Sequence, residues 1–269
     1  MTDRQLAIPP GLDATFVLVR HGESTWVAEG RVQGGADPPL SPIGGRQVAL
    51  VANRLADPWA SPALPVPGGR PLGCWHSPLR RAVATATPIA ERWAPALQAR
   101  PDERLREIGQ GEWEGLTGAE VRARYRDVRA GWRRDPVHVH APGGESLQDA
   151  DARARPFVAD LLGLAAAGGG AGGGAGGGQE ESPPAAASLQ RGPWMIVVAH
   201  EGILRVLVLA LLDLPLDAFW RFPIGLCALS IVEIRNGRPA LRAHNLQEHL
   251  APLGAGAGIA ATQDRGGAL

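Results

Sequence analysis

The chain has 269 residues, of which 45% are hydrophobic, and this is enough for one domain with a sizeable core. Its 27 Lys and Arg residues balance its 27 Asp and Glu residues, which argues against a protein that coats nucleic acid or an anionic membrane. Two cysteines, Cys74 and Cys227, exclude a disulfide framework and a multi-thiolate zinc site, but do not show whether they pair.

Neither the N-terminal segment nor the apolar runs resemble a targeting or membrane segment. Residues 1–12 contain two charges and two prolines in place of the continuous apolar core of a signal peptide. The longest apolar run, 203–212, is too short to cross a bilayer and contains Arg205. We therefore expect a soluble cytoplasmic protein with neither a nucleic-acid nor a membrane partner.

Short apolar runs alternate with helical stripes along the chain. This alternation predicts an α/β fold, a three-layer sandwich in which helices flank a mainly parallel central sheet. The expected strands are 15–20, a weaker one at 71–76, 194–199, and a closing hairpin of 229–234 and 239–244; the expected helices are around 48–55, 79–93 with a kink at Pro88, 117–125, 147–164 and 203–212.

Low-complexity composition marks the parts of the chain outside this pattern. Residues 163–192, rich in Gly and Ala, hold too little apolar surface to offset their ordering entropy, which predicts a flexible segment. By composition alone, it either links two domains or is inserted into one. Residues 1–13 are expected to be an N-terminal extension and 251–269 a disordered tail.

Basic and histidine-containing turns follow three of the predicted strands. They are Arg20-His21-Gly22-Glu23, His76-Ser77-Pro78 and His200-Glu201-Gly202. Open α/β sheets bind ligands at the carboxyl ends of their strands. An arginine fork suits phosphate or carboxylate oxygens, and a neutral imidazole can be a nucleophile, a base or a metal ligand. The first turn alone fits a structural histidine as well as a catalytic one.

Four segments in order resemble the histidine phosphatase superfamily, the phosphoglycerate-mutase-like group. They are Arg20-His21-Gly22-Glu23, the Ser-x-Leu-x-Arg-Ala pattern of residues 77–82, Glu107 before the Gly-x-Trp-Glu-Gly loop of residues 111–115, and His200 after the late strand. Smaller similarities lie at 31–34, 37–40 and 142–146. The resemblance covers about residues 16–250. It implies a single domain over 14–250, with 163–192 as an insertion within it.

The resemblance implies a phosphomonoesterase that acts on a small phosphate ester. His21 would attack phosphorus and become a phosphohistidine, while Arg20, Arg81 and His200 would hold the phosphoryl oxygens. A protonated Glu107 would give its proton to the leaving alcohol, although Glu103, Glu112 and Glu114 are close in sequence. Because positioned protein cations would stabilise the transferring group, neither a metal nor a cofactor is expected. The further candidate phosphate contacts are Ser24, Thr25, Gln33 and Gly34, of which the first two could instead cap the turn.

Two positions depart from the family's pattern. Val27 stands where the family often has Asn, so one polar contact is expected to be missing. Glu201 stands where the family often has Gly; it would either favour a protonated His200 or face solvent. Arg205 would pair with a buried acid or lie at the edge of the pocket.

Two further groups have a structural and a functional interpretation. His138 and His140 could be metal ligands, but flanking prolines and the lack of a nearby acidic or cysteine cluster disfavour this. The arginine-rich stretch over 122–134 is either a solvated helix face, which is favoured, or a lid that attracts an anionic substrate; its arginines are Arg122, Arg124, Arg126, Arg129, Arg133 and Arg134.

Three other functions compete with a small-molecule phosphatase. A phosphoglycerate mutase of the family would have a longer insertion after the acid residue, whereas only 34 residues separate Glu107 from Pro142 here, which favours water as the acceptor. A non-catalytic phosphate-binding or scaffolding protein fits poorly with the presence of all four core residues. A phosphoprotein phosphatase would need an open site. The sequence leaves the substrate and the oligomeric state open.

Overall fold

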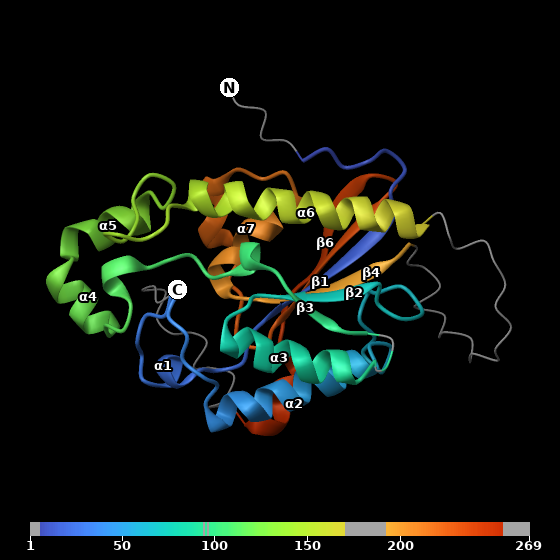
Figure 1. Ribbon diagram of the computed structural model, residues 1–269, viewed down its shortest axis with the longest axis horizontal. Helices are drawn as coiled ribbons and strands as arrows, with labels where there is room; N and C mark the ends of the chain where they lie inside the picture. The colour runs from blue at the N-terminus through green and yellow to red at the C-terminus, as the bar shows by residue number, and fades with distance from the viewer. Residues whose placement is uncertain (1–5, 94, 96, 170–191, 255–269) are drawn as a thin grey trace, which may run out of the picture.

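The computed structural model describes residues 6–93, 95, 97–169 and 192–254. It shows a central sheet with helices on both faces (Figure 1). The strands are β1 (Ala14–Arg20), β2 (Gly73–His76), β3 (Ala99–Pro101), β4 (Trp194–Ala199), β5 (Leu229–Arg235) and β6 (Arg238–Leu246). The helices are α1 (Thr25–Ala28), α2 (Pro42–Ala56), α3 (Arg80–Glu91), α4 (Gly118–Arg124), α5 (Arg126–Arg134), α6 (Leu147–Gly169) and α7 (Glu201–Leu211).

The strand order places the predicted site-bearing turns at one edge of the sheet. The order is β3-β2-β4-β1-β5-β6, in which β1 to β4 run parallel and β5 runs antiparallel to both of its neighbours. Arg20 at the end of β1 pairs with Ala199 at the end of β4, and His76 at the end of β2 pairs with Val198. The carboxyl ends of three adjacent strands therefore meet, as the predicted parallel sheet requires.

Alternate side chains of β1 enter two separate cores. Phe16 and Leu18 lie in the core on the side of α6 and α7, whereas Val17 and Val19 lie in the core shared with α2 and α3 (Figure 1). Because helices cover both faces, β1 is buried along its whole length. This explains why its sequence is a continuous apolar run and confirms the three-layer α/β architecture.

The regular elements agree with the sequence prediction except at their margins. The buried strands and the closing hairpin are confirmed, the weaker strand is shortened to β2, and β3 was not predicted. Asn236 and Gly237 take the positive φ angles, 51° and 75°, that a tight hairpin turn requires. The helix predicted over 117–125 is α4, and a separate helix, α5, follows it.

The expected start of the flexible insertion is wrong by several residues. Residues 163–169 continue α6, and Ala165 is fully buried in the core between α6 and the sheet. Ala165 belongs to a run of low-complexity composition, yet its small side chain is buried in the core, whereas Ala166 and Ala167 are exposed. The rest of the expected insertion, 170–191, lies outside the described residues.

The predicted N-terminal extension is partly packed against the domain, whereas the described part of the predicted tail, 251–254, is mostly exposed. Leu12 is buried, and Leu6 and Ile8 pack against the same core as α6. At the other end, a 3₁₀ turn over Glu248–Leu253 buries Leu250; the tail from residue 255 onward lies outside the described residues.

Cys74 and Cys227 are both buried free thiols. In the part of the chain that the structure describes, no helix has the length and apolar character needed to span a bilayer.

Candidate active site

The two histidines of the predicted site are neighbours because β1 and β4 are paired. The His21 backbone N–H donates to the carbonyl of Ala199, at 3.0 Å, and so ties the two strand ends together. The rings of His21 and His200 meet edge to face with their centroids 5.0 Å apart. The histidines lie 179 positions apart in the sequence and share one site, as the sequence predicted.

The hydrogen bonds of His21 present its Nε2 atom to the site. Nδ1 lies 2.7 Å from the carbonyl of Gly22, so this nitrogen carries the proton and donates. Nε2 is left with its lone pair and faces Nε of Arg81 at 3.3 Å. Burial, and then the charges of Arg81 and Arg20, lower the pKa of His21 well below its usual value. The ring is therefore neutral at pH 7, the form that a nucleophile requires.

Arg81, in the first turn of α3, is held between the two histidine rings. Its Nη1 and Nη2 donate to the carbonyls of Ala36 and Gly34, at 2.6 and 2.9 Å, and its Nε also lies 3.1 Å from Nδ1 of His200. Burial lowers its pKa to about 10, so it remains a cation at neutral pH. The guanidinium thus offers a fixed positive charge beside the lone pair of His21.

Arg20, the last residue of β1, has a buried donor atom without a partner among the described residues. Its Nη1 donates to the carbonyl of Ile224, at 2.7 Å, and pairs with Glu201 at 2.5 Å. Its Nε is buried and has no hydrogen-bond partner among the described residues. A buried donor without a partner is costly, and an anionic ligand would supply the missing acceptor.

Glu201 contacts arginines rather than His200. It bridges Arg20 and Arg205, whose guanidinium also donates to the carbonyl of Phe222 at 3.0 Å. Burial and the charge of Arg81 lower the pKa of His200 well below its usual value. The alternative of a solvent-facing carboxylate is therefore wrong, because Glu201 is paired with two arginines. Of the two alternatives for Arg205, pairing with an acid is confirmed.

A hydroxyl group orients the ring of His200. Its Nε2 lies 2.7 Å from Oγ of Ser77, which is fully buried directly after β2. With Nδ1 accepting from Arg81, the proton of the neutral ring is on Nε2 and is donated to Ser77. The sequence showed Ser77 only as part of a motif and gave no sign of this contact.

The carboxyl group of Glu107 is buried at the N-terminus of α7, the helix for which His200 is the N-cap residue. Its Oε1 accepts from the N–H groups of Ile108 and Ile203, at 2.9 and 3.0 Å, and its Oε2 accepts from the N–H of Gly202 at 3.1 Å. Burial raises the pKa of Glu107 despite these three hydrogen bonds and the charge of Arg81. The carboxyl group therefore keeps its proton to higher pH than an exposed glutamate.

The other glutamates close in sequence have different surroundings. Glu103 and Glu112 are exposed, and Glu112 accepts from the hydroxyl of Tyr125. Glu114 accepts from the backbone N–H groups of Gly35 and Gln110, at 2.8 and 2.9 Å. The carboxyl group of Glu107 thus lies at the first turn of α7, near enough to Arg81 to feel its charge. Glu114 instead holds the loop whose carbonyls fix Arg81.

Of the four further candidate contacts, only Gly34 is shown in contact with Arg81. Oγ of Ser24 donates to Oε1 of Gln33 at 2.6 Å and accepts from the N–H of Val27, so it caps α1 as one of its two alternatives predicted. Thr25 is the first residue of α1. Gly34 reaches the site through its carbonyl, which accepts from Arg81. With its Oε1 engaged by Ser24, Gln33 offers its amide nitrogen as a donor.

The remaining groups singled out by sequence lie apart from this cluster. His138 is exposed and pairs with Asp135, and Nδ1 of His140 lies 3.0 Å from the carbonyl of Ala141. Within residues 6–93, 95, 97–169 and 192–254, no group of three or more metal-ligating side chains could hold a metal ion. Val27 is buried and brings no polar side chain to the site. The arginines of α4 and α5 are exposed except Arg129.

Comparisons with known proteins agree with the motifs. The family model of the histidine phosphatase superfamily (branch 1) matches residues 16–169 and 184–247. The chain is 28% identical to phosphoserine phosphatase 1 of Hydrogenobacter thermophilus, over 87% of this chain and 93% of that one. It is 36% identical to glucosyl-3-phosphoglycerate phosphatase of Mycobacterium tuberculosis, over 74% of this chain and 76% of that one. A solved structure of mycobacterial glucosyl-3-phosphoglycerate phosphatase with VO3 superimposes with a TM-score of 0.66, at 30% identity, over 87% of this chain and 99% of that one.

Proposed function

The chain belongs to the histidine phosphatase superfamily, and from that premise we propose that it hydrolyses small phosphate monoesters through a phosphohistidine formed on His21. The observation that carries the proposal is the neutral ring of His21, whose Nε2 lone pair faces the Arg81 cation at 3.3 Å. A nucleophile next to a fixed cation suits attack on a group that bears negative charge.

The phosphoryl group binds between the two arginines and His200. Arg20 contributes its buried, unpartnered Nε, and Arg81 contributes the Nε that faces both histidine rings in the free protein. The negative charge of the substrate would favour a protonated His200, which then donates to a phosphoryl oxygen through Nδ1. Gln33 adds its amide nitrogen as a further donor.

The reaction proceeds in two steps. Nε2 of His21 attacks phosphorus, the P–O bond to the alcohol breaks, and the Glu107 proton passes to the departing oxygen. A water molecule then attacks the phosphohistidine, the P–N bond breaks, and Glu107 takes the proton of that water. Inorganic phosphate and the alcohol leave, and His21 and Glu107 return to their starting forms.

The substrate class proposed is a small phosphate monoester. The two relatives named above are called phosphatases of phosphoserine and of glucosyl-3-phosphoglycerate, which supports a small organic ester with water as the acceptor. The short segment between Glu107 and Pro142 argues against a mutase, which must exclude water from its phosphohistidine. Incubation with 3-phosphoglycerate and 2,3-bisphosphoglycerate separates the two reactions, because a mutase forms 2-phosphoglycerate and a phosphatase releases inorganic phosphate.

The chemistry is proposed to need neither a metal nor a cofactor, because Arg20, Arg81 and His200 supply the positive charge around the phosphoryl group. Activity is expected to survive exhaustive chelation with EDTA and to be inhibited by vanadate. Loss of activity in EDTA that a divalent ion restores would contradict this part of the proposal.

The test is direct trapping of the phosphoenzyme. With a ³²P-labelled ester, rapid acid quench of the wild-type protein should give acid-labile, base-stable label on the protein, as a phosphohistidine does. His21→Ala should abolish both the label and nearly all turnover, whereas His138→Ala, at an exposed histidine outside the site, should leave both unchanged. Label on the His21→Ala protein, or turnover in the wild type without any label, would overturn the proposal.

A further inference from the structure

An ion pair outside the cluster holds the backbone that carries Glu107. Arg153, on α6, pairs through Nε with Oε1 of Glu145 at 2.6 Å and through Nη2 with Oε2 at 2.8 Å, so the contact is bidentate. Both side chains are about one-fifth exposed, at 22% and 21%. Neither residue was a predicted site residue, although Glu145 lies in the short 142–146 segment that resembles the family.

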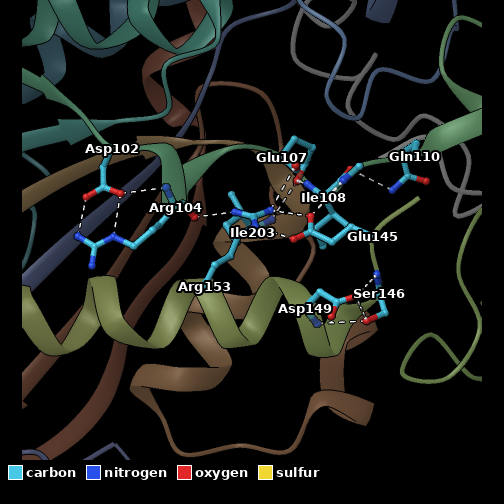
Figure 2. Close-up of polar contacts among 11 residues, drawn as sticks. Asp102, Arg104, Glu107, Ile108, Gln110, Glu145, Ser146, Asp149, Arg153 and Ile203 are labelled. Atoms are coloured by element: carbon cyan, nitrogen blue, oxygen red, sulfur yellow. Dashed lines mark hydrogen bonds and ion pairs between the residues drawn. The ribbon is translucent and has the colours of Figure 1, made fainter. Parts of the chain in front are cut away.

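The same two side chains hold the backbone on both sides of Glu107. Arg153 donates through Nη1 to the carbonyl of Arg104, at 2.6 Å, and through Nη2 to the carbonyl of Glu107, at 3.3 Å. Glu145 accepts from the N–H of Gly109 through Oε2, at 3.2 Å, and its own N–H donates to the Gly109 carbonyl at 2.8 Å. Figure 2 shows Arg153 rising from α6 to this segment, with Glu145 beside it.

The segment needs such support because it has little regular structure of its own. A 3₁₀ turn ends at Leu105, and no helix or strand holds residues 106–110. The carboxyl group of Glu107 must nevertheless meet three backbone N–H groups, two of which belong to the first turn of α7. Its place therefore depends on how the backbone of residues 104–109 is fixed relative to α6 and α7.

We propose that Glu145 and Arg153 are positioning residues that aim the proton-donating Glu107 carboxyl at the leaving group. The inference rests on the proposed function, in which Glu107 is the general acid. Arginine suits this task because its planar fork donates in several directions at once, whereas a lysine ammonium at the same place cannot span the carboxylate and both carbonyls. Neither side chain is proposed to touch the substrate.

The test uses substitutions that keep size but break the geometry, Arg153→Lys and Glu145→Gln. Arg155→Lys is the matched control, because Arg155 lies two positions away on the same helix, pairs with Asp151 within α6, and is similarly buried at 19% exposure. Glu107→Gln is the reference for complete loss of the proton donor. Circular dichroism and thermal unfolding confirm that each variant is folded.

The readout is kcat/KM for two substrates, an alkyl phosphate with a poor leaving group and 2,4-dinitrophenyl phosphate, whose leaving group needs no proton. Arg153→Lys and Glu145→Gln should each lower the alkyl value by about 10- to 100-fold, within the roughly 10²–10⁴-fold that general acid catalysis provides. The dinitrophenyl value should change less than about threefold by the same reasoning. In the Glu107→Gln background neither substitution should lower the alkyl value further, and Arg155→Lys should change neither value.

The outcomes separate this inference from the proposed function. If Glu107→Gln shows the selective loss but Arg153→Lys and Glu145→Gln slow both substrates equally, or add their full loss to Glu107→Gln, the pair has a general structural role and the inference is wrong. If Glu107→Gln itself shows no selectivity for the alkyl ester, the proposed proton donor is wrong. Selective, non-additive losses in both variants support the inference.

Discussion

His21 and Glu107 have pKa values displaced in opposite directions, and both displacements arise mainly from burial. Burial disfavours the charged form of each group, so it lowers the pKa of the imidazole and raises that of the carboxyl. The proposed reaction needs a neutral His21 together with a protonated Glu107. At the ordinary pKa values of 6.5 and 4.5, Glu107 would lose its proton at a lower pH than the one at which His21 becomes neutral. Both shifts therefore act in the direction that favours the coexistence of the two required forms.

This opposition predicts the shape of the pH profile of kcat/KM, which reports the ionisations of the free enzyme. Activity should fall toward low pH only below the usual histidine range, because the lowered pKa keeps His21 neutral there. It should fall toward high pH as Glu107 loses its proton, at a pH above the usual value of 4.5 for glutamate. The measurement is kcat/KM for an alkyl phosphate between about pH 4 and pH 9, a range that brackets the ordinary carboxyl and imidazole pKa values.

Glu107→Gln is the control for that profile, because the substrate's own ionisation is the same for both proteins. The substitution should remove the alkaline limb and leave the acidic limb in place, at a lower overall rate. An alkaline limb that persists unchanged in Glu107→Gln would show that another group sets it, and that Glu107 does not act as the proton donor in this range.

The individual site residues differ in how far the sequence predicts them. The resemblance to the family's motifs indicates His21, Arg81 and Glu107. The partners that fix them are different. Glu201 was assigned to His200 or to solvent, whereas it bridges two arginines, and Arg153 carried no signal at all. Such contacts are set by packing between distant segments, which residue type and spacing do not encode.

At the scale of elements, the first turn of α7 is fitted closely around Glu107. A Cβ atom on Gly202 would lie 2.7 Å from Oε1 of Glu107 and 2.9 Å from Cδ1 of Ile108. Gly202→Ala should therefore displace the carboxyl group from the helix N-terminus and lower kcat/KM for an alkyl phosphate by about 10- to 100-fold, a part of the general-acid contribution. Steady-state kinetics with the alkyl and dinitrophenyl esters measures this.

Gly163→Ala is the matched control on another helix. Gly163 is exposed on α6, and a Cβ there meets no atom within 4 Å. Alanine should raise the free energy of unfolding by up to about 1 kcal/mol, the difference in helix propensity, without changing activity. Full activity of Gly202→Ala for the alkyl ester would contradict the proposed fit between α7 and Glu107.

Elements were predictable where burial leaves a strong pattern. The continuous apolar runs of β1 and β4 indicate strands buried on both faces, and the Asn236-Gly237 pair indicates the hairpin turn. β3 has three residues, none of them buried, so it leaves no pattern. The end of α6 differs from the prediction because Ala and Gly, which here continue a helix with Ala165 buried, also dominate flexible segments.

For the whole molecule, the parallel order of β2, β4 and β1 brings residues from distant parts of the chain into one site. Strand-end turns that are far apart in the sequence become neighbours because their strands are paired. Every contact described above for the site joins residues that the structure describes. The sheet topology, which the alternation of strands and helices predicts, therefore brings the candidate site residues together.

The described residues on either side of 170–191 line the same part of the surface. Ala165, Ala166 and Gly192 line one surface hollow of about 360 Å³. A Cβ on Gly168 would contact Leu72, whose N–H donates to the carbonyl of Trp194 at 2.7 Å. The end of α6 is thus close to the start of β4, and a short linker is able to join them.

We therefore expect residues 171–190 to be dispensable for the reaction, provided that the deletion leaves α6 intact. Replacing residues 171–190 with about eight Gly and Ser residues, which reach up to roughly 26 Å, should keep turnover of an alkyl phosphate within a few-fold. The free energy of unfolding should be unchanged or slightly higher, because loop closure changes by only about 0.6 kcal/mol per doubling of length. Replacing residues 165–187 instead removes the buried Ala165 and should lower the free energy of unfolding. Denaturant unfolding and kinetics test both variants; loss of activity in a folded 171–190 variant would show that the insertion contributes to the site.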